Sequence, residues 1–367
     1  MESMGLNLGF WKGKNVFITG HTGFKGGWLS TWLKKHGANV LGYSLQPPTN
    51  PNLFEAANIK EGIDSIIADV RDLKNLKSVI LSRKPEIIIH MAAQAIVRYS
   101  YNNPVETLTT NIVGTLNVLE SVRDNDFVRA IVIVTSDKCY ENKEWVWGYR
   151  EADSLGGYDP YSASKSCSEL IASCYNNSFF NPSDYGKDHH VAIATARAGN
   201  VFGGGDWAID RLIPDCIKAL SKNDVIVVRH PNASRPWQFV LEPLYGYLEL
   251  AQKLYNDGPI YGGAWNFGPD DSNIKPVKWI VEQIIKLWGT PASWKTFGNN
   301  QPHETSYLKL DCSKAKSQLN WYPRWNLEES LEKTIEWYKA YYNGEDVLKI
   351  MMEQIEKYEK NNSKEGG

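Results

Sequence analysis

One stretch decides the fold of this chain: Asn15-Val16-Phe17-Ile18-Thr19-Gly20-His21-Thr22-Gly23-Phe24-Lys25-Gly26. Its first five residues predict a short buried strand, and the residues after Gly26 have the apolar periodicity of a helix. The glycines between them allow the backbone to approach a pyrophosphate, which the N-terminus of a helix attracts. Glycine turns without ligands are common, but the strand–turn–helix context favours nucleotide binding here.

The alternation of strand and helix patterns continues from this unit as far as Arg197. Such alternation predicts right-handed βαβ units and therefore an α/β fold with a doubly wound parallel sheet of the Rossmann type, which we assign to residues 1–197. Further strands are expected at residues 39–44, 63–68, 86–91, 132–134 and 190–194, and a helix at about residues 105–122.

The pattern of predicted strands and helices changes after Arg197. The glycine-rich residues 199–207 are not followed at once by a helix, and strand-like runs become short. We expect residues 198–360 to form mainly a smaller, mixed α/β lobe that binds the substrate, with some segments returning to the large domain. Two polar helices are expected at residues 327–342 and 347–360, and residues 361–367 are expected to be a flexible tail.

Bulk composition narrows the class of protein. The 367 residues include 40 Lys and Arg against 42 Asp and Glu, a formal charge of -2, which does not favour a nucleic-acid partner. No apolar run is long enough to span a membrane, and no secretory signal is visible. The five cysteines have no metal-ligand spacing, so we expect no metal site and a cytoplasmic protein.

The strand ends of the predicted sheet supply candidates for holding a dinucleotide. No acidic residue follows Ser44 at the end of the second strand, and no arginine follows closely, so NAD is favoured over NADP without being settled. Asp69 could accept from an adenine amino group or could cap the next helix. Asn111, within a helix, could order the active site or only tie the sheet together. The full set of expected cofactor contacts is Gly20, Thr22, Gly23, Phe24, Lys25, Gly26, Ser44, Asp69, Val70, Ala92, Ala93, Gln94, Asn111, Tyr161 and Lys165.

The candidate catalytic residues lie in two stretches. The apolar strand at residues 132–134 stops at a polar cluster that includes Ser136, Asp137 and Lys138, as a buried strand does when its carboxyl end opens into a site. Tyr161 and Lys165 are four residues apart, which places them on one face of a helix. A nearby cation lowers the pKa of a phenol toward that of a useful base. The alternatives are an ordinary helix-surface pair and a structural ion pair between Asp137 and Lys138.

Residues after Arg197 supply candidates for substrate binding. Arginine is the usual bidentate partner of phosphate, and this region contains Arg211, Arg229 and Arg235. Of these, Arg211 and Arg235 are the candidates. Arg235 is the stronger one, because it lies in a compact strand-like run. Tyr307 belongs to a loop at residues 302–307 that could close over a substrate.

Together these motifs resemble the extended short-chain dehydrogenase/reductase superfamily, in the nucleotide-sugar branch that forms the NAD-dependent epimerase/dehydratase family. The resemblance extends over nearly the whole chain. Within the branch, residues 20–26, 135–145, 203–207 and 303–311 are most similar to the 4,6-dehydratases that act on CDP-glucose. Related dTDP-glucose enzymes have a glutamate after the catalytic aspartate, where this chain has Lys138.

The resemblance implies a role for each catalytic candidate. Tyr161, assisted by Lys165, would take the proton of the sugar O4 hydroxyl. Ser136 would hydrogen-bond the same oxygen. At the same time C4 would give its hydride to tightly held NAD+. Lys138 would then remove the C5 proton and Asp137 would protonate the departing O6 hydroxyl; the reverse assignment stays open. Hydride return to C6 would give the 4-keto-6-deoxy sugar used in deoxysugar and O-antigen-type biosynthesis. Asn200, Arg211 and Arg235 would bind the diphosphate.

The resemblance also implies a homodimer or a dimer of dimers, formed through the helices after Val105 and Tyr161. Two other functions stay open at this point. One is an NAD-dependent enzyme on the same scaffold that epimerises a nucleotide sugar or dehydrates a UDP-, dTDP- or GDP-linked sugar. The other is a non-catalytic nucleotide sensor. The residues that recognise the nucleotide base are not visible in the sequence.

Overall fold

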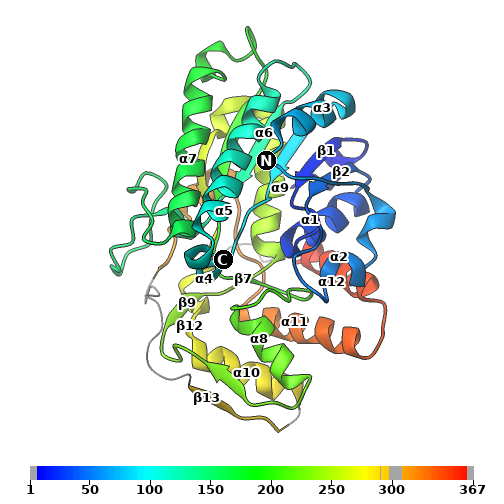
Figure 1. Cartoon of the computed structure of the whole chain (residues 1–367), viewed down its shortest axis with the longest axis vertical. Coiled ribbons are helices and arrows are strands. Elements are labelled where there is room, and N and C mark those ends of the chain that lie inside the picture. The colour runs from blue at the N-terminus through cyan, green and yellow to red at the C-terminus, as the bar shows by residue number, and fades with distance from the viewer. Residues whose placement is uncertain (1–5, 290, 297–307, 362–367) are drawn as a thin grey trace.

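The computed structural model describes residues 6–289, 291–296 and 308–361 of the chain. A seven-stranded sheet with the order β11-β6-β5-β4-β1-β2-β3 lies at its centre, and every pair of neighbouring strands is parallel (Figure 1). This order confirms the predicted doubly wound sheet. The strands are β1 (Asn15–Thr19), β2 (Asn39–Ser44), β3 (Asp64–Ile67), β4 (Ile87–His90), β5 (Ala130–Val134), β6 (Ala192–Arg197) and β11 (Gly263–Asn266).

Five of the six predicted strands lie where the sequence placed them, but the sixth was placed too early. It was expected at residues 190–194 and extends instead from Ala192 to Arg197. Before it, the backbone N–H of Val191 donates to the His189 ring, 3.3 Å away. The strand continues to Arg197 because β5 pairs with one of its edges and β11 with the other.

Helices cover both faces of the sheet and create two apolar cores. Val16 and Ile18 of β1 face a core shared with α1 (Phe24–Lys35) and α9 (Leu241–Asp257). Phe17, between them, faces a second core shared with α3 (Leu73–Arg83), α6 (Gly114–Val122) and α7 (Pro160–Ser178). Strands buried on both faces are apolar throughout, which is why the sequence shows runs rather than alternation.

The two C-terminal helices have the predicted bounds, α11 (Leu327–Tyr342) and α12 (Val347–Lys360). Each buries one face, and α12 packs against α1. Glu359 of α12 accepts hydrogen bonds at 2.7 Å from both Trp32 Nε1 and Lys35 Nζ. The late segments β11 and α12 therefore complete the large domain, and the proposed boundary at residue 197 stays a prediction.

The smaller lobe occupies the lower part of Figure 1. It contains α8 (Leu212–Leu220), α10 (Val277–Trp288) and short strand pairs. The pairs are β7 (Val201–Phe202) with β10 (Gln238–Phe239), β9 (Ser234–Pro236) with β12 (Ile274–Pro276), and β8 (Ile226–Val228) with β13 (Trp294–Thr296).

The helix predicted at about residues 105–122 is interrupted by a π-helical turn. The chain forms α5 (Pro104–Leu108), a π turn at Thr109–Val113 and then α6. Such turns occur within α-helices and are frequent at functional sites. Here the turn carries Asn111, whose side chain is buried.

Two features are absent from the residues that the structure describes. No helix among them combines the length and the apolarity that a membrane span requires. No group of three or more His, Cys, Asp or Glu side chains among them is arranged to hold a metal ion.

Gly26 is expected to be intolerant of a side chain. An added Cβ would lie 2.1 Å from the carbonyl oxygen of Gly20, so the backbone would have to move. We expect Gly26→Ala to lower the free energy of unfolding by about 1–3 kcal/mol, measured by urea denaturation without added nucleotide. Gly23→Ala is the matched control, since its Cβ would lie 3.4 Å from the same oxygen. Equal losses in the two variants would contradict this steric explanation.

Candidate active site

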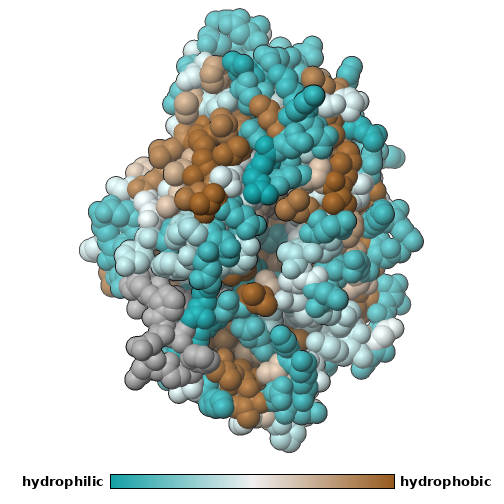
Figure 2. Space-filling view, viewed as in Figure 1, coloured by the Kyte–Doolittle hydropathy of each residue, from teal (hydrophilic) through white to brown (hydrophobic). Residues whose placement is uncertain are grey.

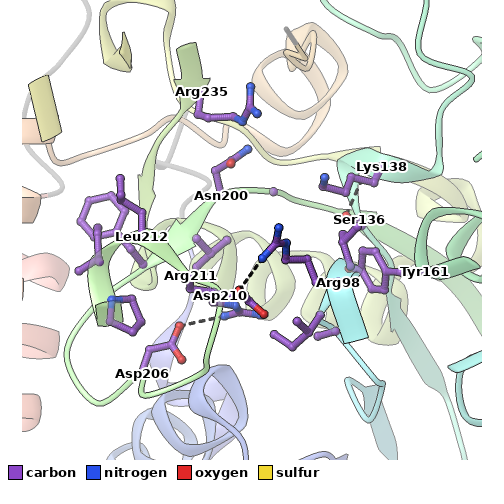
Figure 3. A pocket seen from close by; sticks show the side chains of 18 of the residues that line it. Arg98, Ser136, Lys138, Tyr161, Asn200, Asp206, Asp210, Arg211, Leu212 and Arg235 are labelled. Carbon is purple, nitrogen blue, oxygen red and sulfur yellow. Dashed lines mark hydrogen bonds and ion pairs between the residues drawn. The ribbon is translucent and has the colours of Figure 1, made fainter. Parts of the chain in front are cut away.

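A cavity of about 340 Å³ lies between the carboxyl edge of the sheet and the smaller lobe. One wall is formed by residues that follow β1, β4, β5 and β6, and the other by α8, β8 and β9. Figure 3 shows Ser136, Lys138 and Tyr161 on one side of this cavity and Leu212 on the opposite side. The predicted catalytic residues are therefore brought together where an open α/β sheet binds its ligand.

Ser136 and Asp137 lie just after the end of β5. The Ser136 hydroxyl accepts the backbone N–H of Lys138 at 3.2 Å and donates to Asp137 Oδ1 at 2.9 Å. This local capping turns the chain into a short 3-10 helix, Asp137–Cys139, and directs the Asp137 carboxylate inward, where it is buried.

Gly199 and Asn200 hold the other side of the Asp137 carboxylate. A Cβ at Gly199 would lie 1.8 Å from Asp137 Oδ2, so only glycine leaves room for the carboxylate. Asn200 Nδ2 donates to the same oxygen at 3.4 Å. Asn200, which was expected to bind a diphosphate, thus contacts the carboxylate of Asp137, a predicted catalytic residue.

Tyr161 and Lys165 project from the first two turns of α7. The helix begins at Pro160, and Asp159 caps it by accepting the Ser162 backbone N–H at 2.9 Å. Lys165 Nζ donates to the carbonyl oxygen of Val134 at 3.1 Å, which ties the helix to the end of β5. Both side chains line the cavity, as the four-residue spacing predicted.

The pKa of Tyr161 moves opposite to the direction expected from Lys165. Burial raises the pKa of Tyr161 to about 12, and a hydrogen bond with Ser136 opposes this shift. Burial also lowers the pKa of Lys165 to about 8. Removal from water thus outweighs the local charge, and the phenol is a neutral hydrogen-bonding group at neutral pH.

Two further lysines line the cavity. Lys138 is only partly buried. Lys25, at the start of α1, lies deeper in the protein; burial and then the charges of Lys165 and Arg211 lower the pKa of Lys25 to about 7. Its Nζ is 3.4 Å from the hydroxyl of Tyr247 on α9.

The glycine turn has the geometry of a pyrophosphate cradle. Gly20 has a left-handed φ of +82°, and a Cβ there would lie 2.8 Å from the Ala92 nitrogen. The N-cap of α1 is Gly23, which has no side chain to accept the first N–H groups of the helix. Those donors are available to an anion, so this part of the site fits NAD.

Other residues predicted to contact the cofactor form hydrogen bonds that hold the segments around the glycine turn together. Thr22 Oγ1 is 2.9 Å from Ser44 Oγ, which joins the turn to the end of β2. Asn111 accepts the Gln94 backbone N–H at 2.8 Å and donates to the Gln94 carbonyl at 3.0 Å and to Ser164 Oγ at 2.8 Å. It therefore orders the loop after β4 against α7. Ala93 and Phe24 line the cavity.

The Asp69–Val70 strand end is engaged within the protein. Arg71 Nη2 donates to Asp69 Oδ2 at 2.6 Å, and this hydrogen bond lowers the pKa of the carboxyl group. Asp72, rather than Asp69, caps the following helix. The Val70 side chain lies in the second core, so a contact to a cofactor would come from its backbone.

Ala92, in the loop after β4, is held by β1, because its backbone N–H donates to Thr19 Oγ1 at 3.1 Å.

Four arginines and two carboxylates form the middle of the cavity. Arg211 donates to Asp206 at 2.9 Å, and Arg98 donates to Asp210 at 3.5 Å (Figure 3). Arg229 donates to the same Asp210 oxygen at 2.8 Å. Arg235 lies near Asn200. The sequence predicted Arg211 and Arg235 here. Tyr307 lies outside the described residues.

A buried ion pair between Arg197 and Glu169 lies beside the end of β5. Arg197 Nε and Nη2 donate to the two carboxylate oxygens of Glu169 at 2.9 and 2.8 Å, and both side chains are 3% exposed. Thr135 and Thr195 donate to the same carboxylate. Arg197 Nη1 also donates to the Tyr140 hydroxyl at 2.7 Å. The pair therefore joins α7, β6 and the residue that precedes Ser136.

Comparison with known proteins agrees with this geometry. Residues 17–334 match the family described as GDP-mannose 4,6 dehydratase. A curated relative, the CDP-glucose 4,6-dehydratase of Salmonella typhimurium, is 53% identical over 96% of this chain and 98% of its own length.

The chain belongs to this dehydratase family, within the NAD-dependent epimerase/dehydratases. The family predicted from the sequence motifs is thereby confirmed.

Solved structures share the fold of this chain at lower identity. The epimerase Mth375 of Methanothermobacter thermautotrophicus superposes with a TM-score of 0.77 at 24% identity, covering 95% of this chain and 96% of the other. DesIV of Streptomyces venezuelae, a dTDP-glucose 4,6-dehydratase solved with NAD and TYD bound, has a TM-score of 0.76 at 20% identity, covering 91% and 99%. These similarities establish the fold.

Sequence reasoning missed several residues of this dehydratase-family site. Glu169 could have been found, because it continues the four-residue spacing of Tyr161 and Lys165 on one face of α7. Arg98 carries no such signal, and Arg229 has only the general signal of an arginine in the region after Arg197. Their place in the cavity depends on how the loop after β4 and strand β8 face each other.

The buried ion pair is expected to be essential for stability. Glu169→Gln keeps the shape of the side chain but leaves the Arg197 charge buried and uncompensated. We expect a loss of about 3–5 kcal/mol in the free energy of unfolding by urea denaturation. Asp124→Asn removes one partner of the exposed Lys77–Asp124 pair and is expected to cost less than about 1 kcal/mol. A small loss in Glu169→Gln would show that the pair is not a structural support.

Proposed function

We propose that this protein dehydrates CDP-glucose to CDP-4-keto-6-deoxyglucose, with tightly held NAD+ as its cofactor. The observation that carries the proposal is the meeting of Ser136, Asp137, Lys138 and Tyr161 in one cavity beside the glycine turn. The 53% identity to a CDP-glucose 4,6-dehydratase over nearly all of both chains supports the choice of substrate. The product would enter deoxysugar biosynthesis.

The cofactor would lie along the carboxyl edge of the sheet. The free N–H groups after Gly23 would hold its pyrophosphate, and the loop at Ala93 and Gln94, ordered by Asn111, would support its nicotinamide half. When bound, NAD+ supplies the hydride acceptor for the sugar C4 and later the hydride donor for C6.

Oxidation at C4 requires a base and a positioning donor at O4. Tyr161 takes the O4 proton, and Ser136, its hydrogen-bond partner, holds the same oxygen. Because burial raises the pKa of Tyr161 to about 12, the phenol needs added positive charge to act as a base. Lys165 supplies part of it from the same helix face, and an oxidised nicotinamide ring is itself cationic.

Loss of water requires an acid and a base on neighbouring carbons. The ketone at C4 acidifies the C5 proton, which Lys138 removes. The C6–O6 bond then breaks as Asp137 delivers a proton to O6, water leaves, and a C5–C6 double bond forms. Gly199 and Asn200 fix the Asp137 carboxyl group in position for this step. Protonation at C5 accompanies the return of hydride to C6.

The diphosphate would lie in the basic middle of the cavity. Asn200 and Arg235 face this region together, and Arg211 approaches it from α8. Arginine is suited to this role because its planar donors match phosphate oxygens. Arg98, which comes from α4 (Val97–Asn102) in the large domain, adds a fourth donor from the opposite wall.

We also propose a homodimer, or a dimer of dimers, in the cytoplasm. Figure 2 shows apolar side chains gathered over α5, α6 and α7. On these helices Val105 is 73% exposed and Leu170 is 59% exposed, which is typical of a surface that a second copy covers. All five cysteines are unpaired, which supports a reducing compartment.

Tyr161→Phe should abolish the first chemical step. The variant lacks the hydroxyl that takes the O4 proton, so we expect turnover to fall by about 10²–10⁴-fold. Neither reduced nicotinamide nor the alkaline ultraviolet absorbance of a 4-keto-6-deoxy sugar should form at the normal rate. Tyr175→Phe is the control on the same helix, since that hydroxyl bonds Glu120 away from the cavity. Normal turnover in Tyr161→Phe would refute its role as the base.

A double variant separates oxidation from dehydration. We expect Asp137→Asn with Lys138→Met to accumulate reduced nicotinamide on the enzyme while elimination stops, because both groups act after C4 is oxidised. Absorbance of the bound cofactor and deuterium exchange at C5 measure the two stages. Formation of a C4 epimer by the wild-type enzyme, with no 4-keto-6-deoxy sugar, would support the alternative epimerase function instead.

A further inference from the structure

The cavity has three zones whose order matches that of a nucleotide sugar. The catalytic residues lie at one end, the arginines in the middle, and Leu212, in the first turn of α8, at the other end (Figure 3). If the hexose lies at Tyr161 and the diphosphate between the arginines, the base must lie against α8 and β8. This placement rests on the proposed function.

The far end of the cavity is suited to a flat ring. Its walls are apolar side chains from the first turn of α8 and from β8: Leu212, Ile213, Pro214, Val227 and Val228. Apolar walls with a few placed polar groups are the usual form of a site that recognises an organic ring. The acidic group that α8 adds to these walls is Asp215.

The Asp215 carboxylate retains capacity to accept hydrogen bonds. In the described part of the chain its nearest cation is Arg229, with Nη2 4.0 Å from Oδ2, which is too long for a hydrogen bond. Arg229 is committed elsewhere: its Nη1 donates to Asp210 Oδ1 at 2.8 Å and its Nη2 to the Asp210 carbonyl at 3.2 Å. The Asp215 side chain is 43% exposed and lines the cavity.

We propose that Asp215 selects cytosine by accepting a hydrogen bond from its exocyclic N4 amino group. Cytosine presents a donor at position 4, whereas uracil and thymine present a carbonyl oxygen there. A carboxylate can only accept, so it pairs with cytosine and repels the other two pyrimidines.

The ionisation of Asp215 is compatible with this role. Burial raises the pKa of Asp215 to about 6, and Arg229 opposes that shift. Above pH 7 the group is therefore mostly a carboxylate. A site that satisfies a substrate hydrogen bond rejects an analogue that cannot form it, because the polar group of the site is left unpaired.

Asp215→Asn tests the proposal, since an amide can donate to the O4 of uracil as well as accept. We expect the ratio of kcat/KM for CDP-glucose to that for UDP-glucose to fall roughly 10- to 100-fold. The change should lie mainly in KM for CDP-glucose, because the base is remote from the reacting carbons. Asp224→Asn, just after α8 and exposed, is the matched control and should keep the wild-type ratio.

Asp215→Ala provides a second, independent reading. It should weaken CDP-glucose without improving UDP-glucose, and calorimetric titration with CDP and UDP should show the same loss of preference. An unchanged CDP-to-UDP ratio in folded Asp215→Asn or Asp215→Ala would overturn the role of Asp215.

Failure of the proposed function would look different. In that case the wild-type protein would dehydrate no nucleotide-linked glucose. A preference for CDP over UDP in the binding titrations that is present in the wild-type protein and lost in Asp215→Asn would still show that Asp215 recognises cytosine.

Discussion

The carboxyl edge of the sheet, where the predicted catalytic residues lie, depends on one buried ion pair. Arg197 and Glu169 bond through two parallel hydrogen bonds where almost no water reaches them, so their attraction is strong and either charge alone would be costly. The pair joins the end of β6 to α7, and Thr135 attaches the end of β5 to the same carboxylate. The strand end that carries Ser136 is thereby held against the helix that carries Tyr161.

Several glycines leave room for neighbouring groups that a side chain would displace. Gly199 leaves room for the Asp137 carboxylate, and Gly26 leaves room for the carbonyl of Gly20 in the turn between β1 and α1. Gly42 does the same for the His21 ring, which would meet a Cβ there at 2.3 Å. In each case the absence of a side chain fixes the position of a neighbouring functional or backbone group, which explains why the glycines matter beyond flexibility.

Burial sets the electrostatics of the site more than charge pairing does. It raises the pKa of Tyr161 and lowers those of Lys165 and Lys25, because each charged form loses water that its neighbours only partly replace. At neutral pH the Tyr161 phenol is therefore neutral, whereas Lys165 still carries most of its charge. The proposed oxidation fits this setting, because the ring that accepts hydride brings a positive charge to the phenol.

The sequence by itself determined the sheet, the glycine turn, the family and the residues at the strand ends, because these depend on local periodicity and on short motifs. It placed β6 too early, since the pairing of β6 with β11 involves residues far apart in the chain. It also could not show that Asn111 orders a loop, that Asp69 is paired with Arg71, or that Arg98 and Arg229 share the cavity. Those facts depend on which distant segments face each other, and only packing in three dimensions decides that.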